Sequence, residues 1–464
     1  MHEFEATANR LRESGEFFLG GQPVYIARAP GRIDVMGGNV DYTGGLVFQM
    51  TTREATWAAA QLREDDRIIF LNPQLRAYGW QERAEFRLED LQHEQRVREL
   101  ANQRAELRWT AYVLGPLHFL QKHFSSRMRS GVSVYLESSV PLNKGVSSSA
   151  AVEVAAMSSV AHACGIELEG IELAQACQWA ENVIAESACG IMDQAAIVLG
   201  EEGSCLPLLC QPCTPFEPIR IPAELALWAI DSGVRHAVTG VEYEAARAAC
   251  FMGYKLICDR EGLTLHLEDR EGIPRWVDPR WNGYASNIPP SVFRSQHEHW
   301  LPETWTGAEF LESGRVHADP FTRVRPEQAY PIRACTRYAV EENHRIQLFV
   351  ELIRGVGSRP SKCACELLGE LMLQSHYSYT ECGLGAEATD LIVKLVREEG
   401  PQRGLYGAKI TGGGSGGTVA VLGDAAAEIP FRRVVERYAK ILGKPPHVFE
   451  GTSMGAKQFG FAVI

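Results

Sequence analysis

The pattern of apolar and polar positions changes its period along the chain, and the changes predict both strands and helices. Residues 24 to 60 hold two apolar, β-rich runs, VYIARAP and LVFQMTT, on either side of the stretch GRIDVMGGNVDYTGG. That order predicts a strand, a tight loop and a second strand. In residues 131 to 165 the alternating run GVSVYLESSV precedes the stretch PLNKGVSSS and the run AAVEVAAMSSVAHACG. This unit predicts a strand, a loop and a helix.

A further helix is predicted over about residues 170 to 186. Apolar side chains recur there at helical spacing on one face, at Leu173, Cys177, Ala180 and Ile184. Glu181 lies beside this apolar stripe, so a carboxylate is expected next to buried side chains.

The second half of the chain changes character twice. Residues 266 to 330 contain four tryptophans and several prolines, which interrupt any period and predict an irregular, packed insertion. Helical patterning returns over residues 361 to 398. The runs YGAKI and TVAVL then flank a glycine cluster and predict two strands around a tight loop.

Composition limits the kinds of protein that this chain can be. Its 464 residues suggest two or three domains, and 45% hydrophobic residues exclude a disordered or fibrous chain. The net charge of −12 repels nucleic acid and acidic membrane surfaces. The start MHEFEATANRLRES lacks the features of a leader, and the 12 cysteines are irregularly spaced. We therefore expect a soluble, cytoplasmic protein with reduced thiols.

The loop from Pro141 to Ser149 leads directly into a predicted helix and offers the first candidate chemistry. Small residues allow consecutive backbone N–H groups to point inward, and the helix N-terminus adds partial positive charge, so the segment suits a phosphate. A serine-capped helix without a ligand has the same pattern and stays open at this point. A Walker A loop is excluded, because that motif needs Gly-Lys followed by Ser or Thr, whereas Lys144 precedes Gly145.

The glycine cluster from Gly412 to Gly417 matches two familiar motifs in its letters alone. Both the dinucleotide pattern G-x-G-x-x-G and the hydrolase pattern G-x-S-x-G around Ser415 require a following helix. Because TVAVL predicts a strand, a glycine hairpin against another loop is favoured. The C-x-x-C pair Cys210 and Cys213 has no second close pair nearby at zinc-finger spacing, so no metal is expected there.

The third loop, residues 29 to 45, holds Arg32, Asp34 and Asp41 among five glycines. Together the three loops resemble the GHMP kinase superfamily, which includes galactokinase, homoserine kinase and mevalonate kinase. The loop at 29 to 45 resembles the galactokinase signature. The serine-rich loop resembles the P-x-x-x-G-L-S-S-S-A phosphate loop, with Val146 for leucine, and the glycine cluster resembles the closing motif. The run CGIMDQ also resembles galactokinases.

Within that superfamily the chain resembles most the kinase domain of the plant L-arabinokinases. The shared runs cover nearly the whole sequence, including the Trp-rich insertion that shorter galactokinases lack. They are DVMGG, KGVSSSAAVEVA, IDSGVRH, FMGYK, LPET, HYSYTECGLG, KITGGGSGGT and VFEGTS. The resemblance does not extend to the plant enzyme's N-terminal glycosyltransferase-like domain.

The resemblance implies an α+β protein with the two-domain GHMP kinase fold. A ribosomal protein S5 domain 2-like N-terminal domain would span residues 1–213 and hold the ATP-binding loop. A ferredoxin-like C-terminal domain would span residues 214–464, with the Trp-rich insertion at about 266–330. The active site would lie between them and bind ATP and a small-molecule sugar, without nucleic acid or membrane. The oligomeric state stays open.

The same resemblance assigns ATP and Mg²⁺ to the serine-rich loop and the helix that follows Gly170. The triphosphate would be wrapped by Asn143, Lys144, Gly145, Val146, Ser147, Ser148 and Ser149. Ser149 and Glu181 would hold Mg²⁺, a hard cation that prefers oxygen ligands and usually keeps several waters. A solvated helix carboxylate is the alternative for Glu181, but it precedes Asp193 by twelve positions, as in galactokinases.

Asp193 matches the galactokinase carboxylate that accepts the proton of the sugar's anomeric hydroxyl. Arg32 would lie beside that hydroxyl and stabilise developing charge. A structural salt bridge uses the same residue types and is the alternative. The sugar-binding set is Arg32, Gly38, Asn39, Asp41, Asp193 and Tyr243, in which Tyr243 could also be an ordinary half-buried tyrosine. His236 and His376 are expected to be structural or peripheral.

One departure from galactokinases affects the substrate. Galactokinases carry Glu-His-Thr-Asp where this chain has Gly38, Asn39, Val40 and Asp41. The missing glutamate is expected to face the sugar's C6 hydroxyl, and L-arabinose has the configuration of D-galactose without C6. The departure favours L-arabinose, while galactose, a uronic acid or another sugar stay open. A non-catalytic sugar sensor is the remaining alternative, although a sensor has no need to keep the base and metal carboxylates.

Overall fold

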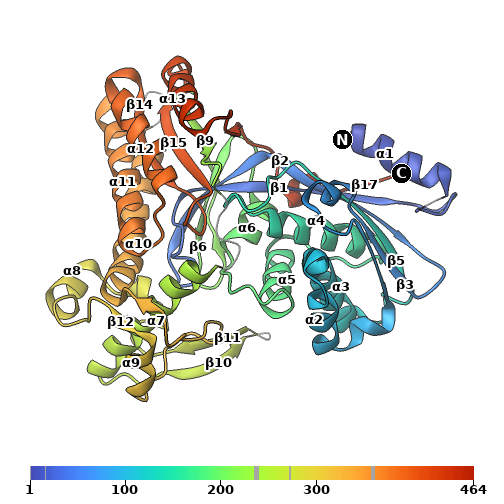
Figure 1. Ribbon diagram of the computed structural model, residues 1–464, viewed down its shortest axis with the longest axis horizontal. Coiled ribbons are helices and arrows are strands. Elements are labelled where there is room, and N and C mark those ends of the chain that lie inside the picture. The colour runs from blue at the N-terminus through green and yellow to red at the C-terminus, as the bar shows by residue number, and fades with distance from the viewer. Residues whose placement is uncertain (1, 16, 235–239, 271–272, 357–360) are drawn as a thin grey trace.

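The larger of two main sheets collects strands from both ends of the chain (Figure 1). The computed structural model describes residues 2–15, 17–234, 240–270, 273–356 and 361–464, and within them this sheet has nine strands. Its main order is β17-β1-β2-β5-β3-β4, and β6 pairs with β2, β7 and β8. The bounds are β1 Tyr25–Met36, β2 Leu46–Leu62, β3 Arg67–Leu71, β4 Arg83–Arg87, β5 Val132–Ser138, β6 Ser204–Leu209, β7 Thr214–Pro215, β8 Ile219–Arg220 and β17 Phe461–Val463.

Helices pack on this sheet in two layers. Helices α4 and α6 lie against β1 and β2, and α3 and α5 pack on α4 in turn. The α4 face is built from small side chains such as Ala150, Ala151 and Ala155, which are fully buried and allow the close approach. The bounds are α1 His2–Ser14, α2 Glu94–Asn102, α3 Ala111–Phe124, α4 Ser148–Ala163, α5 Gly170–Val183 and α6 Met192–Leu199. The strand-loop-strand, strand-loop-helix and second-helix predictions for this half are confirmed.

The second sheet has four antiparallel strands in the order β14-β15-β9-β16. In chain order its strands and the helices α12 and α13 follow a β-α-β-β-α-β path, the ferredoxin-like arrangement that the resemblance implies. The predicted YGAKI and TVAVL strands are β14 and β15. The bounds are β9 Leu225–Asp231, β14 Leu405–Ile410, β15 Thr418–Asp424, β16 Val448–Glu450, α12 Glu387–Glu399, α13 Glu428–Leu442 and α14 Ala456–Phe459.

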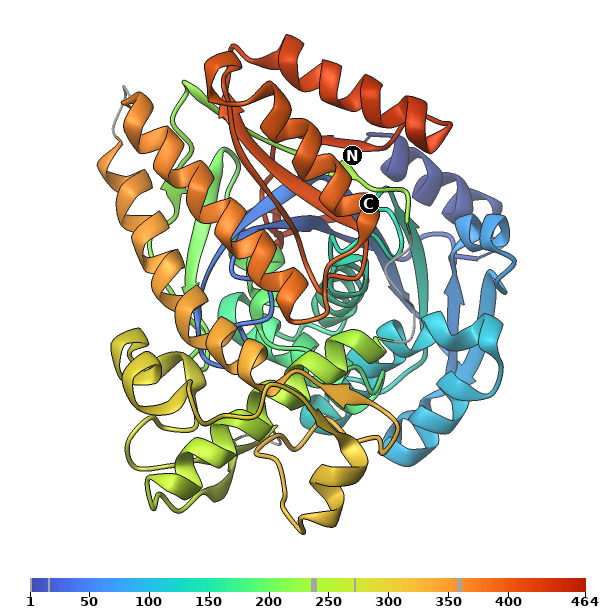
Figure 2. The same cartoon turned by 60° about the vertical axis from the view of Figure 1, so that its left-hand side comes forward.

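Three long helices connect the second sheet to the Trp-rich insertion, which lies at the lower end of the molecule in Figure 1. These helices are α7 Val241–Arg260, α10 Ile332–Gly355 and α11 Lys362–Glu381, and α10 packs on both others (Figure 2). The insertion holds β10 His266–Arg270, β11 Ile273–Val277, α8 Pro290–Val292, β12 Trp305–Thr306, α9 Gly307–Glu312 and β13 Ala329–Tyr330. It is packed, as predicted, since Trp281, Phe293 and Phe310 are buried. The β10–β11 hairpin is an addition to that prediction.

Segments near the expected domain boundary belong to the larger sheet. Strands β7 and β8 follow residue 213 yet pair with β6, and β17 at the far end of the chain pairs with β1. The larger sheet thus includes strands on both sides of residue 213, and the division into two domains at that residue stays a prediction. All twelve cysteines are free thiols. Among the described residues, every helix is too short or too polar to cross a membrane.

Candidate active site

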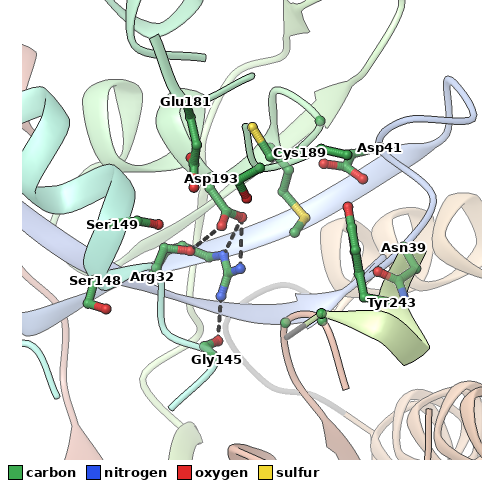
Figure 3. Close-up of a pocket in the computed structure, with 18 of the residues that line it drawn as sticks. Arg32, Asn39, Asp41, Gly145, Ser148, Ser149, Glu181, Cys189, Asp193 and Tyr243 are labelled. Atoms are coloured by element: carbon green, nitrogen blue, oxygen red, sulfur yellow. Dashed lines mark hydrogen bonds and ion pairs between the residues drawn. The ribbon is translucent and has the colours of Figure 1, made fainter. Parts of the chain in front are cut away.

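A cavity of about 250 Å³ opens where the three glycine-containing loops meet. Figure 3 shows the Arg32–Asp193 pair in its middle, with Ser149 and Glu181 toward one side and Asp41, Asn39 and Tyr243 toward the other. Most of the predicted site residues line it. They are Arg32, Asn39, Asp41, Asn143, Lys144, Gly145, Ser147, Ser148, Ser149, Glu181, Asp193 and Tyr243.

Arg32 holds the carboxylate of Asp193 in place. Its Nε and Nη2 lie 2.8 and 2.7 Å from Oδ1 of Asp193, while the hydroxyl of Ser147 donates to the other carboxylate oxygen. Nη1 of Arg32 donates to the Gly145 carbonyl oxygen at 2.7 Å. Arg32 is buried, and although burial lowers the pKa of its guanidinium, Asp193 and Asp34 reverse that effect and the net shift is upward. The guanidinium therefore stays charged and joins the carboxylate to the serine-rich loop.

The serine-rich loop and the glycine cluster lie in contact, as the sequence predicts for a glycine hairpin against another loop. The Thr418 hydroxyl donates to the Lys144 carbonyl oxygen at 2.7 Å. A Cβ on Gly412 would lie 2.6 Å from the Gly145 carbonyl oxygen, so position 412 admits only glycine without a backbone shift. Gly145 itself has φ +70. The close approach of the two backbones therefore depends on glycine at both positions.

The Lys144 side chain is already paired. Its ammonium lies 3.0 Å from Oδ1 of Asp231 at the end of β9, with both side chains largely buried. An incoming triphosphate would compete with Asp231 for this ammonium or share it. The loop around Lys144 bends through the left-handed conformations of Asn143 and Ser147, both at φ 58.

The residues predicted to hold Mg²⁺ lie next to each other. Ser149 lies near the buried Glu181 carboxylate, and Nε2 of Gln194 donates to Oε2 of Glu181 at 2.6 Å. A second buried carboxylate, Glu153, adjoins Glu181, and in the part of the chain that the structure describes its Oε1 has no hydrogen-bond partner. Burial and the neighbouring negative charges raise the pKa of both glutamates. Buried oxygens short of a cation fit Mg²⁺.

No group of three or more His, Cys, Asp or Glu side chains within the described ranges could enclose a metal ion. A site built from Ser149 and Glu181 would therefore take its other ligands from phosphate and water, as Mg²⁺ commonly does.

The end of the cavity that is predicted to face the sugar carries Asp41, Asn39 and Tyr243. Burial raises the pKa of Asp41 to about 6, and the charge of Asp193 adds to this, while Tyr42 N–H, Arg247 and Arg32 oppose it. The Asn39 amide is buried, and its Nδ2 has no partner among the described residues, which leaves a donor in the cavity wall. Tyr243 lies in the first turn of α7. The Asp41 carboxylate and the Tyr243 hydroxyl can accept hydrogen bonds at this end of the cavity, and the Asn39 amide can donate one.

Gly38 and Val146 differ from the sequence-based expectation, because neither lines the cavity. Val146 is fully buried, and only its backbone contributes, by accepting from the Arg32 N–H at 3.1 Å. The space that a side chain on Gly38 would need is filled by the Tyr379 hydroxyl and by Oδ2 of Asp34. In this chain a glutamate at position 38 would need Tyr379 and Asp34 to move before it could project toward a sugar.

Several cavity residues were not singled out from the sequence. They are Tyr112, Ser187, Ala188, Cys189, Gly190, Met192, Gly240, Gly412 and Gly413. The CGIMDQ run and the glycine cluster were signals for five of these, whereas Tyr112 in α3 had none. His376 is buried behind β14 and accepts from the Ile410 N–H, which fits a structural role. His236 lies outside the described residues.

Comparison with known proteins agrees with this geometry. Residues 16–62 match the galactokinase galactose-binding signature, residues 111–201 the GHMP kinases N terminal domain and residues 364–440 the GHMP kinases C terminal domain. L-arabinokinase of Arabidopsis thaliana is 34% identical over 99% of this chain and 48% of that protein. Galactokinase of Chloroflexus aggregans is 30% identical over 88% of this chain and 86% of that protein.

Solved structures show the same fold. Lactococcus lactis galactokinase complexed with galactose superposes with a TM-score of 0.75 at 21% identity, covering 97% of this chain and 98% of that one. A mevalonate kinase superposes with a TM-score of 0.53 at 15% identity, covering 93% and 99%.

The chain therefore belongs to the GHMP kinases. Within them it is similar to galactokinases and to an L-arabinokinase, so it is a GHMP kinase of the galactokinase and arabinokinase type. It spans about half the length of the L-arabinokinase that it matches and most of the length of the galactokinases.

Proposed function

We propose that this protein transfers the γ-phosphoryl group of ATP to the anomeric hydroxyl of a monosaccharide, with L-arabinose as the substrate. The observation that carries the proposal is the Arg32–Asp193–Ser147 arrangement between the serine-rich loop and the sugar-facing end of the cavity. A carboxylate held by two partners beside a phosphate-binding backbone suits phosphoryl transfer, which depends mainly on positioning and charge neutralisation.

In the proposed mechanism Asp193 accepts the proton of the anomeric hydroxyl as the bond to phosphorus forms. Arg32 is oriented by Asp193 and the Gly145 carbonyl oxygen, so its charge lies between the two substrates and stabilises the transferring group. Asn143 to Ser149 bind the triphosphate through backbone N–H groups. Ser149 and Glu181 would hold Mg²⁺, which neutralises phosphate charge when bound.

The choice of L-arabinose rests on two supports. The chain is 34% identical to an L-arabinokinase over nearly its full length, against 30% for the Chloroflexus aggregans galactokinase. Position 38, where galactokinases carry a glutamate, has no room for a side chain because of Tyr379. A galactose C6 hydroxyl would lack that partner, and a buried hydroxyl without a partner costs about 1–3 kcal/mol.

Charge pairing disfavours a uronic acid. Among the described residues that line the cavity, the cationic side chains are Arg32 and Lys144, and each already faces an aspartate. A sugar carboxylate would meet Asp41 without a spare cation to neutralise it.

The test is ADP release with L-arabinose, D-galactose, D-galacturonate, D-glucuronate and L-fucose, followed by phosphorus NMR to locate the phosphate on C1. We expect L-arabinose to have the highest kcat/KM, by roughly 5-fold to 100-fold over D-galactose. Preferred turnover of D-galactose or a uronic acid would contradict the substrate. Sugar binding in calorimetry without turnover by any of the five would favour the sensor.

A further inference from the structure

Arg247 lies at the back of the sugar-facing wall and is not part of the cavity lining. It is one helical turn after Tyr243 on α7 and is 3% exposed. Its Nη1 donates to the Ala188 carbonyl oxygen at 3.1 Å, two residues before Gly190. Its guanidinium also stacks on the Tyr42 ring, 4.9 Å from the ring centroid. One buried cation therefore touches three segments that form the wall.

Those three segments carry the predicted sugar contacts. Tyr42 follows Asp41 directly and donates its backbone N–H to Oδ1 of Asp41 at 2.8 Å. Gly190 packs so tightly on the Asp41 carboxylate that no Cβ would fit there. Tyr42 also meets the Tyr243 ring edge-on at 5.9 Å. The positions of Asp41 and Tyr243 therefore depend on what lies behind Tyr42 and Gly190.

The insertion supplies the counter-ion of Arg247. Both carboxylate oxygens of Asp319 accept from it, at 2.8 Å to Nε and 2.9 Å to Nη2. The Asp319 side chain is fully buried and is held by the Thr322 hydroxyl at 2.7 Å. The Phe321 ring covers the guanidinium with its centroid at 5.4 Å. A bidentate, buried pair of this kind fixes geometry as well as charge.

The wall formed by Asp41, Tyr42 and Gly190 is not close-packed on the side that faces away from the candidate active site, so the Arg247–Asp319 pair is needed to support it. A second cavity of about 990 Å³ lies between the insertion and helices α3 and α5, and Asp41, Tyr42 and Gly190 line it as well. Arg247, Asp319 and Phe321 also line this larger cavity. A thin wall between two cavities lacks the neighbours that usually hold a core side chain in one place.

We infer that Arg247 and Asp319 are positioning residues for the sugar. Through this ion pair the Trp-rich insertion holds the sugar-binding wall in place. The inference rests on the proposed sugar phosphorylation. It predicts that breaking the pair weakens sugar binding while leaving ATP binding unchanged, because within the described ranges the hydrogen bonds of Arg247 run to Ala188 and Asp319 and not to the serine-rich loop.

The pair also acts on the charge of Asp41. The groups that face this carboxylate are Asp193 from α6, Arg32 from β1, Arg247 and Tyr243 from α7, Cys189 from the preceding loop, Cys210 after β6 and Tyr379 from α11. Arg247 lowers the pKa of Asp41, against the larger effect of burial. Removing the cation should therefore raise that pKa, and removing the Asp319 charge should lower it.

The experiment compares Arg247→Met, Arg247→Lys and Asp319→Asn with wild type in the full chain. Sugar and ATP KM, kcat, calorimetric sugar Kd and the pH profile of kcat/KM for the sugar are measured. For Arg247→Met we expect a roughly tenfold or larger rise in sugar KM and Kd with ATP KM within about twofold, since a buried charged hydrogen-bond set is lost. Arg247→Lys should recover part of the sugar affinity.

The pH profile of kcat/KM for the sugar distinguishes a charge effect on Asp41 from a general loss of stability, which would not shift the acid limb. The acid limb should shift to higher pH in Arg247→Met and to lower pH in Asp319→Asn, while Arg247→Lys keeps it near the wild-type position. Arg345→Met is the matched control, because Arg345 is also buried and ion-paired but its partners Glu341 and Glu342 do not line the cavity. It should leave sugar KM and the acid limb unchanged.

The inference would be overturned if Arg247→Met raised the sugar KM and the ATP KM equally. It would also be overturned if the acid limb moved in the same direction in Arg247→Met and Asp319→Asn. Thermal melting identifies a variant that fails to fold, in which case Arg247→Lys and Thr322→Val, which retain the charges, carry the KM comparison. Absence of turnover in wild type would instead refute the proposed function, and the calorimetric sugar Kd would still decide the role of the pair.

Discussion

The hydroxyl group of Tyr379 occupies the space that a side chain on Gly38 would need. It also donates a hydrogen bond to the Gly412 carbonyl oxygen, while the Tyr338 hydroxyl donates to the carbonyl oxygen of Gly38. Two tyrosines of the second half of the chain thus fix the loop that precedes Asn39 and Asp41. This relationship changes what a substitution at position 38 can reveal about the substrate.

Gly38→Glu is expected to destabilise the protein instead of narrowing the preference for L-arabinose over D-galactose. Gly38→Ala isolates the steric effect, and forcing one extra carbon against Tyr379 and Asp34 should cost about 1–3 kcal/mol of unfolding free energy. Thermal melting of Gly38→Ala measures the loss, with Gly20→Ala, which has open space at its Cβ position, as the control. A stable Gly38→Glu protein with an altered sugar ratio would show that the loop can open.

Asp193→Asn should lower kcat by roughly 10² to 10⁴ with little change in folding or ATP affinity, because it removes the proton acceptor and keeps the shape. The loose transition state of phosphoryl transfer places the expected loss toward the low end. Steady-state kinetics with L-arabinose, together with nucleotide binding by calorimetry, make the measurement. Ser147→Ala, which removes only a hydrogen bond to Asp193, should have a smaller effect. Unchanged turnover in Asp193→Asn would exclude this residue from proton transfer.

Ser149→Ala and Glu181→Gln should each raise the Mg²⁺ concentration needed for half-maximal rate, since each removes or neutralises an oxygen ligand. The measurement is a metal titration at fixed ATP. Ser148→Ala, which changes a neighbouring hydroxyl in the same cavity, is the control. Identical curves for wild type and both variants would assign the metal to other groups.

Sugar affinity should fall as the pH drops through about 6, the value to which burial raises the pKa of Asp41. The ionised carboxylate accepts stronger hydrogen bonds from sugar hydroxyls than the protonated acid does, and the raised pKa means that Asp41 is protonated already in mild acid. Sugar KM should then rise by up to about tenfold for each pH unit below the pKa. Asp41→Asn should bind sugar more weakly and show no such dependence, whereas a constant wild-type KM from pH 7 to 5 would contradict the assignment.

Local patterns were enough to predict the elements that carry the chemistry. The alternating run before the serine-rich loop and the helix after it gave β5 and α4, and the strand pair around the glycine cluster gave β14 and β15. The pairing of Arg32 with Asp193 came from the family resemblance, since no local pattern relates residues so far apart, and the contact of Ser147 with Asp193 was not predicted. Periodicity describes neighbours in sequence, whereas these contacts are made by the packing of three loops.

The residues that sequence reasoning missed are those whose role depends on distant partners. Asp319 lies in a stretch without any period, and nothing near it in sequence indicates that it neutralises Arg247. The space at Gly38 is set by Tyr379, which lies on α11. A glycine that avoids a clash and a glycine that leaves room for a ligand look the same in one sequence.

Because β17 pairs with β1, the larger sheet can be completed only after the last strand has been synthesised. Tyr25, Ile26 and Ala27 bond to Val463, Ala462 and Phe461, so one edge of the larger sheet stays open until those late residues emerge. The hydrogen bonds that Arg28 donates to the Met454 carbonyl oxygen and the Ser453 hydroxyl can likewise form only after those residues have been synthesised. Since β1 also carries Arg32, this part of the candidate site adjoins a strand edge whose backbone groups stay unpaired until β17 is made, and such an edge can pair with another chain.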